Sequence, residues 1–163
     1  MLAPVDGPGP AAQHVEQFAE VLQSVARSIT QVRLHERLLR AAGVRVDRSG
    51  VVLLHKLAVE GDSLRVTDLS EMLGVDTPAV TRKVQQLERE GLVARRSDPE
   101  DRRASRLRIT PAGRRIVERV WKARQVWLEQ LLEGWTDDDL RTLGALLGRF
   151  GKDLERDLED ARV

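Results

Sequence analysis

Residues 64–115 read LRVTDLSEMLGVDTPAVTRKVQQLEREGLVARRSDPEDRRASRLRITPAGRR, and this stretch decides the fold. Its apolar spacing predicts a short helix, a turn and a second helix, followed by two strands around a turn-forming tip. Two helices and a basic hairpin in this order suit double-stranded DNA. Paired helices also occur as ordinary structure, so the hairpin carries much of the inference.

The first of the two helices is expected to take Thr67 as its N-cap and to end at Gly74, which supplies the positive φ needed to leave a helix. Its apolar side chains are expected to face inward, with Val75 filling the turn. These side chains are Leu69, Met72 and Leu73.

The second helix is predicted to start after Asp76, a good N-cap, with Pro78 in its first turn where no backbone donor is lost. Val80, Val84 and Leu87 form the stripe expected to be buried. The opposite face has short side chains near the N-terminus, hydroxyl and amide groups for base edges, and a cation for phosphate. Its candidate DNA-contacting residues are Thr77, Ala79, Thr81, Arg82 and Gln85.

Two segments, 92–96 and 105–110, have strand character, and residues 97–103 between them form a turn-rich tip. Residues 95–115 hold eight arginines against three acidic residues. A positive patch of this kind attracts phosphate, although charge alone fits a solvated hairpin equally well. The candidate DNA-contacting residues of this wing are Arg95, Arg96, Asp101, Arg102 and Arg103.

The whole chain has 163 residues and fits one domain, with a net charge of only +1. Residues 65–115 hold twelve Lys and Arg against eight Asp and Glu, so the basic charge is concentrated there. The absence of Cys excludes disulfides and thiolate metal sites. The start of the chain has no signal-peptide pattern and no run is apolar enough to span a membrane, so we expect a cytoplasmic protein without a membrane partner.

Long helices are predicted on both sides of this central segment. Residues 1–11, with three Pro and two Gly, are expected to be a disordered tail. Residues 12–45 are expected to contain one amphipathic helix of roughly 30 residues. A further helix is expected to run from near Asp47 to Gly61, at the start of a DNA-binding region that spans residues 46–110.

Residues 111–163 are expected to form C-terminal dimerisation helices. Thr110 caps the first, which is predicted to run to about Glu133, and Thr136 with Asp139 forms a capping box for the second. The apolar stripe of this last helix is too long for one small core to bury. It consists of Leu140, Leu143, Leu147, Phe150, Leu154 and Leu158.

The combined pattern resembles the MarR family of bacterial transcription regulators. The similar stretches are Leu-Gly-Val before a capped helix, Leu-Glu-Arg-Glu-Gly-Leu-Val, Asp-Pro-Glu-Asp-Arg-Arg, and Leu-Arg-Ile-Thr-Pro-Ala-Gly-Arg. They cover about residues 50–115. The resemblance implies one mainly α domain, a winged helix-turn-helix with a two-stranded wing flanked by dimerisation helices.

The resemblance also implies residue roles. Arg103 would enter the minor groove, Asp101 would orient it through a charge-assisted hydrogen bond, and Arg82 would contact phosphate. The alternative is that Asp101 and Arg103 simply pair at a loop tip. Ala79 and Pro78 depart from the residues common in the family, which leaves the operator sequence open.

The function implied is that of a homodimeric repressor that binds a pseudopalindromic operator and is released by a small-molecule effector. Two alternatives remain open: a protein-interaction module with a basic face, and a sequence-tolerant architectural DNA binder. The sequence contains no catalytic, cofactor-binding or metal-ligand pattern, since His14, His35 and His55 are scattered. Of the three tryptophans, two are expected to lie in the core.

Overall fold

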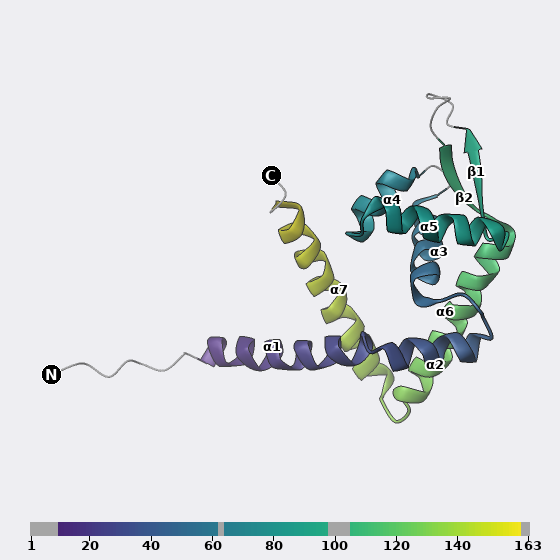
Figure 1. Cartoon of the computed structure of the whole chain (residues 1–163). Helices are drawn as coiled ribbons and strands as arrows, with labels where there is room; N and C mark the ends of the chain where they lie inside the picture. Colours follow the sequence, from purple (N-terminus) through teal and green to yellow (C-terminus); the bar gives the residue numbers. More distant parts are fainter. Residues whose placement is uncertain (1–9, 62–63, 98–104, 161–163) are drawn as a thin grey trace. The chain divides into compact units, whose positions relative to one another are not determined.

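The computed structural model describes residues 10–61, 64–97 and 105–160, and within these ranges the chain is mainly helical with one two-stranded antiparallel sheet (Figure 1). This confirms the predicted fold class. The elements are α1 (Pro10–Ile29), α2 (Val32–Ala42), α3 (Arg48–Glu60), α4 (Val66–Leu73), α5 (Thr77–Arg89), β1 (Val93–Ser97), β2 (Ser105–Ile109), α6 (Pro111–Leu131) and α7 (Asp137–Asp160).

The chain divides into two compact units, Met1–Arg124 and Gln125–Val163. The hydrophobic core lies in the first unit, where α3 packs against α5 and β2, and α5 packs against β1. The side chains that are almost completely buried come from α3, α4, α5 and β2. They are Leu53, Leu54, Leu57, Leu69, Val84, Leu87, Leu107 and Ile109.

The start and end of each central helix follow from local chemistry. The Asp47 carboxylate accepts the N–H of Gly50 at 3.0 Å and caps α3, and Asp76 accepts the N–H of Ala79 at 3.1 Å and caps α5. Gly74 ends α4 with a φ of 61°. These ends confirm the predicted cap at Asp76 and the predicted helix end at Gly74, and α3 starts near Asp47 as expected, because each signal depends only on neighbours in the sequence.

The structure corrects three expectations around α4. Its N-cap is Arg65, not Thr67, and the Asp68 carboxylate accepts the N–H of Arg65 at 2.7 Å. Met72 and Val75 are each 45% exposed, so neither is the core residue that was predicted. The helix α4 is only eight residues long, and it packs on the core through its two buried residues, Leu69 and Ser70.

The prediction of one helix of roughly 30 residues within 12–45 is wrong, because the helix is interrupted between α1 and α2. The Thr30 hydroxyl donates to the carbonyl of Ala26 at 2.7 Å, and the Ser28 hydroxyl donates to that of Ser24 at 2.9 Å. Such side-chain bonds compete with the helical ladder. Gln31 then adopts an extended ψ of 133°, and the apolar period continues across the break.

The wing and the start of α6 are joined by Thr110. Its hydroxyl donates to the carbonyl of Gly91 at 2.7 Å and accepts the N–H of Gly113 at 3.1 Å, which confirms its predicted role as a cap. A Cβ at Gly113 would overlap the carbonyl oxygen of Leu92. A short bridge also connects Leu64 to Leu107, where the Leu107 N–H donates to the Leu64 carbonyl at 2.8 Å.

The long terminal helices expose apolar side chains. No residue of α7 is buried, and its leucines at 140, 143, 147, 154 and 158 are between 37% and 55% exposed. On α1, the exposed apolar side chains are Val15, Phe18, Val21, Val25 and Ile29. Trp121 is 54% exposed and Trp135 48%, so the prediction that two tryptophans lie in the core fails within a single chain.

None of the helices in the described residues is both long and apolar enough to cross a membrane.

Candidate nucleic-acid interface

The outer face of α5 presents two of the predicted DNA-contacting side chains directly. Arg82 and Gln85 are exposed, while Val80, Val84 and Leu87 anchor the opposite face in the core. Within the described residues Arg82 forms no ion pair or hydrogen bond, so its charge is available to a phosphate. The helix begins with Asp76 as its cap, which fixes its first turn and therefore the direction of this face.

The predicted hydroxyl contacts near the start of α5 are already partly used inside the protein. The Thr81 hydroxyl donates to the carbonyl of Thr77 at 2.8 Å, and the Thr77 hydroxyl lies 3.0 Å from the hydroxyl of Ser70. A hydroxyl that donates one hydrogen bond keeps its acceptor positions. The Thr81 hydroxyl oxygen therefore still has acceptor positions.

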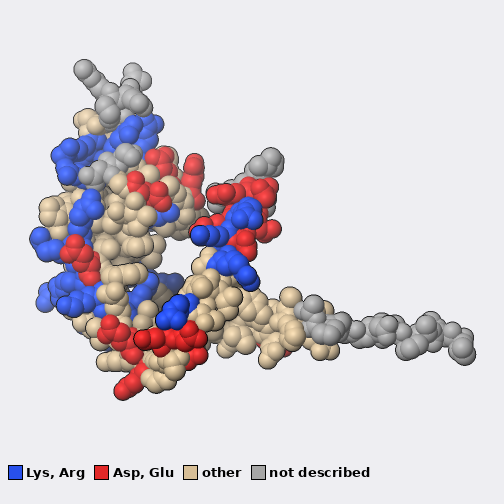
Figure 2. All heavy atoms as spheres, turned by 180° about the vertical axis from the view of Figure 1, so that it is seen from behind, with Lys and Arg blue, Asp and Glu red and all other residues tan. Residues whose placement is uncertain are grey.

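Three arginines share one face of the wing. Val93 pairs with Ile109 across the sheet, Ala94 with Arg108, and Arg96 with Arg106. Because side chains alternate along a strand, Arg96, Arg106 and Arg108 lie on the face opposite the buried Leu107. Figure 2 shows Lys and Arg side chains gathered over the wing strands.

Arg106 and Arg108 were not among the candidate residues, although the alternation of polar and apolar residues from 105 to 110 held the signal that places them on this face. The predicted contacts Asp101, Arg102 and Arg103 lie outside the described residues.

Arg95 lies on the other face of the wing and is held there. Its Nε donates to both carboxylate oxygens of Glu88 at 3.0 and 3.1 Å, and its Nη1 donates to the Ser105 hydroxyl at 3.1 Å. Arg95 thereby connects α5, β1 and β2. Arg96, its neighbour, is exposed, and its side chain forms no ion pair or hydrogen bond within the described residues.

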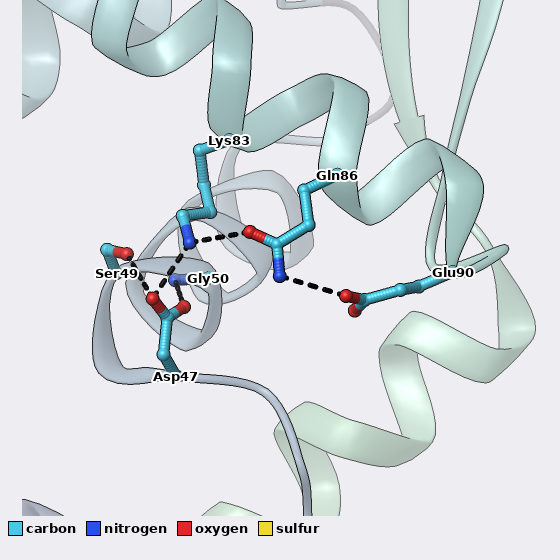
Figure 3. Close-up of polar contacts among 6 residues, drawn as sticks. All are labelled: Asp47, Ser49, Gly50, Lys83, Gln86 and Glu90. Atoms are coloured by element: carbon cyan, nitrogen blue, oxygen red, sulfur yellow. Dashed lines mark hydrogen bonds and ion pairs between the residues drawn. The ribbon is translucent and has the colours of Figure 1, made fainter.

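A second group of polar contacts ties the back of α5 to the start of α3 (Figure 3). Lys83 Nζ donates to Asp47 at 2.8 Å and to the Gln86 side chain at 2.9 Å, and Gln86 donates to Glu90 at 2.9 Å. Lys83 therefore faces the protein and not the predicted DNA side. Sequence reasoning missed this contact, because no local pattern connects positions 47 and 83.

The ionisation of Asp47 follows from these contacts. Partial burial raises its pKa, but hydrogen bonds from Lys83, from the N–H of Gly50 and from Ser49 outweigh that effect. The pKa of Asp47 is consequently lower than its ordinary value of 3.8. The carboxylate stays charged and keeps both its capping bond and its ion pair at neutral pH.

A cavity of about 550 Å³ opens between α3 and α5, under the first turns of α5. Its lining is mostly apolar, with Lys83 and Asp47 among the polar residues. The predicted base contact Ala79 also lines it. The apolar lining residues are Val52, Leu53, Leu73, Val75, Ala79 and Val80.

The three histidines lie on three different helices, His14 on α1, His35 on α2 and His55 on α3. His35 Nδ1 lies 3.1 Å from the carbonyl of Gln31, and no cluster of three or more metal-ligating side chains occurs in the part of the chain that the structure describes.

Curated relatives match more than half of this chain. The YdgJ HTH-type transcriptional regulator of Bacillus subtilis is 33% identical over 94 residues, which are 58% of this chain and 57% of that protein. The YxaD HTH-type transcriptional regulator of the same organism is 33% identical over 107 residues, 66% of this chain and 74% of that protein.

Solved structures match nearly the whole fold. A MarR family protein from Bacillus stearothermophilus superposes with a TM-score of 0.77 at 26% identity, covering 88% of this chain and 96% of that one. FabT of Streptococcus pneumoniae, solved in complex with DNA, superposes with a TM-score of 0.66 at 20% identity, covering 87% and 98%. The MarR family model matches residues 48–105, from the start of α3 to the start of β2. The chain belongs to the MarR family of HTH-type transcriptional regulators.

Proposed function

We propose that this protein binds a pseudopalindromic operator as a homodimer and acts as a ligand-responsive repressor. The observation that carries the proposal is the pairing of two cationic surfaces in one unit: Arg82 on the outer face of α5, and the wing face that bears Arg96, Arg106 and Arg108. A major-groove helix beside a basic wing is the arrangement that reads both grooves of one half-site. FabT, which shares the fold, was solved in complex with DNA.

The homodimer is supported by the exposed apolar stripes of α1 and α7. A monomeric soluble protein rarely exposes apolar surface of this length. A two-fold dimer would carry two copies of α5, and half-sites about one helical turn of DNA apart would match them. The predicted operator is therefore pseudopalindromic.

Ligand responsiveness is supported by the cavity beside α5. Its volume of about 550 Å³ falls within the range of small-molecule pockets. A molecule bound there would touch Val80 and Ala79 on α5 and Val52 on α3, so it would bias the position of the DNA-reading helix. Val52→Trp, which narrows the cavity from the α3 side, is expected to remove the response to an effector and to leave operator binding intact.

The testing experiment is a footprint of the full-length protein on the DNA upstream of its own gene, repeated with a panel of phenolic and drug-like compounds. We expect a protected pseudopalindrome at moderate salt, and release of that DNA by at least one compound. Equal affinity for the upstream fragment and for random duplex would favour an architectural binder. Retention of DNA affinity in Arg82→Ala and Arg103→Ala would favour a protein-interaction module.

A further inference from the structure

A carboxylate, Glu88, lies at the C-terminal end of the helix that is proposed to read DNA. Acidic side chains repel phosphate, so a carboxylate at this position is expected to have a role within the protein. Its two oxygens accept the Nε–H of Arg95 at 3.0 and 3.1 Å, and the side chains of Glu88 and Arg95 are 26% and 34% exposed. The pair is partly shielded from solvent by the elements it connects.

The strand register explains why Arg95 meets Glu88. Arg95 pairs with Leu107, whose side chain is completely buried, so both residues lie on the face of the wing that packs on the protein. Arg95 Nη1 also donates to the hydroxyl of Ser105. Ser105 lies two residues before Leu107 on β2 and therefore on the same face of the wing. One guanidinium thus holds α5 and both strands together.

A two-stranded hairpin is marginally stable by itself, so its direction depends on what it contacts. Below the wing, Val93 and Ile109 are buried in the core and fix its base. Further along the strands, Arg95 is the described side chain that connects β1 to α5 through an ion pair. The distance between a groove-reading helix and a groove-reading wing is set at this point.

We propose that Glu88 and Arg95 are positioning residues that hold the wing at a fixed angle to α5 and thereby set operator specificity, and that Arg95 is not a phosphate contact. The inference rests on the proposed function. It assigns different roles to two adjacent arginines: Arg95 orients the wing, and Arg96 on the opposite face meets the DNA backbone.

The two roles predict opposite signs for one substitution. If Glu88 acted only through its charge, Glu88→Gln would remove a repulsion and tighten binding to every duplex. If Glu88 positions the wing, the same change weakens binding to the operator and leaves binding to random duplex unchanged or tighter. The measured quantity is the ratio of the two dissociation constants.

The experiment measures these constants by fluorescence anisotropy over a series of salt concentrations for the full-length protein. We expect Glu88→Gln and Arg95→Gln each to weaken operator binding about tenfold, within the range for coupled contacting residues. We expect Arg95→Gln to leave the dependence on salt unchanged. The matched control Arg96→Gln is expected to reduce the salt slope by about one on both duplexes.

The charge-swapped variant, Glu88→Arg with Arg95→Glu, tests the pairing itself. It is expected to recover operator affinity to within about threefold of wild type, because contacting partners show non-additive effects. Circular dichroism of each variant checks that it is folded. Recovery of operator affinity in the charge-swapped protein would also show that the single variants lose affinity because the ion pair is broken and not because the protein is unfolded.

Tighter binding of Glu88→Gln to operator and random duplex alike would overturn the inference. A salt slope lowered by about one in Arg95→Gln would also overturn it. If wild-type protein showed no preference for operator, the proposed function would fail and this inference with it. A wild-type preference that Glu88→Gln leaves unchanged would overturn the positioning role alone.

Discussion

Lys83 and Asp47, which are 36 positions apart in the sequence, form an ion pair in which Lys83 Nζ lies 2.8 Å from a carboxylate oxygen of Asp47 (Figure 3). The same carboxylate caps α3. Lys83 belongs to α5, so the start of α3 is tied to the inner side of the helix that is proposed to read DNA. This cation therefore holds α5 in place and does not lie on its outer face.

Asp47→Ala is expected to lower the free energy of unfolding by about 1–2 kcal/mol, because it removes an N-cap together with the partner of Lys83. Lys83→Met is expected to cost less than about 1 kcal/mol, since the Asp47 side chain is 57% exposed and solvent weakens the ion pair. Urea denaturation measures both. An equal loss in the two variants would show that the cap contributes little.

Acidification tests the same carboxylate. The pKa of Asp47 is lower in the folded protein than its ordinary value of 3.8, so its contribution to stability is present above that pH and is lost as pH falls through the folded pKa. Asp47→Asn removes this titration. We therefore expect the stability difference between wild type and Asp47→Asn to shrink as pH falls below about 4 and to vanish only below the lower folded pKa, as followed by denaturation at a series of pH values. A constant difference between pH 7 and pH 3 would contradict the assignment.

Gly113→Ala is expected to destabilise the protein by about 1–3 kcal/mol, the usual effect of overpacking. Gly113 lies in the first turn of α6, where a Cβ would overlap the backbone carbonyl oxygen of Leu92. Backbone cannot move aside as a flexible side chain can. Elsewhere in a helix Ala is more favourable than Gly, so a more stable Gly113→Ala protein would refute the close approach.

Leu147→Glu is expected to convert the proposed homodimer to monomer without unfolding the chain. Leu147 is 51% exposed on α7, so within one chain the change should cost no more than about 0.5 kcal/mol. In a dimer the new carboxylate would be buried in the apolar stripe. Sedimentation velocity measures the change, with Thr142→Glu, outside that stripe, as the control of equal charge. A Leu147→Glu protein that remains dimeric would place the interface elsewhere.

The sequence predicted those features that depend on neighbouring residues. Asp76, Gly74 and Thr110 signal helix ends through bonds that span three or four positions, and the alternation around Leu107 and Ile109 signals a strand. These predictions agree with the structure. They were sufficient to place α5 and the wing next to one another in the chain.

Features that depend on distant residues were not predictable in this way. The pairing of Lys83 with Asp47 and the contact of Arg95 with Ser105 exist only after the core has formed. The break after Ile29 was missed for a different reason, since the apolar spacing continues from Val25 to Val32 although the backbone leaves the helical conformation at Gln31. Periodicity reports which face is apolar, not whether the backbone is continuous.

The central claim is that α5 and the wing form one specific interface with DNA, and the most direct measurement is the salt dependence of binding to the upstream DNA and to random duplex by wild type and Arg82→Ala. We predict that wild type prefers the upstream DNA by at least about a thousandfold, in the range of specific regulators. We predict that Arg82→Ala lowers the salt slope by about one on both duplexes. Equal affinity of wild type for the two duplexes, with a slope that Arg82→Ala leaves unchanged, would contradict the account.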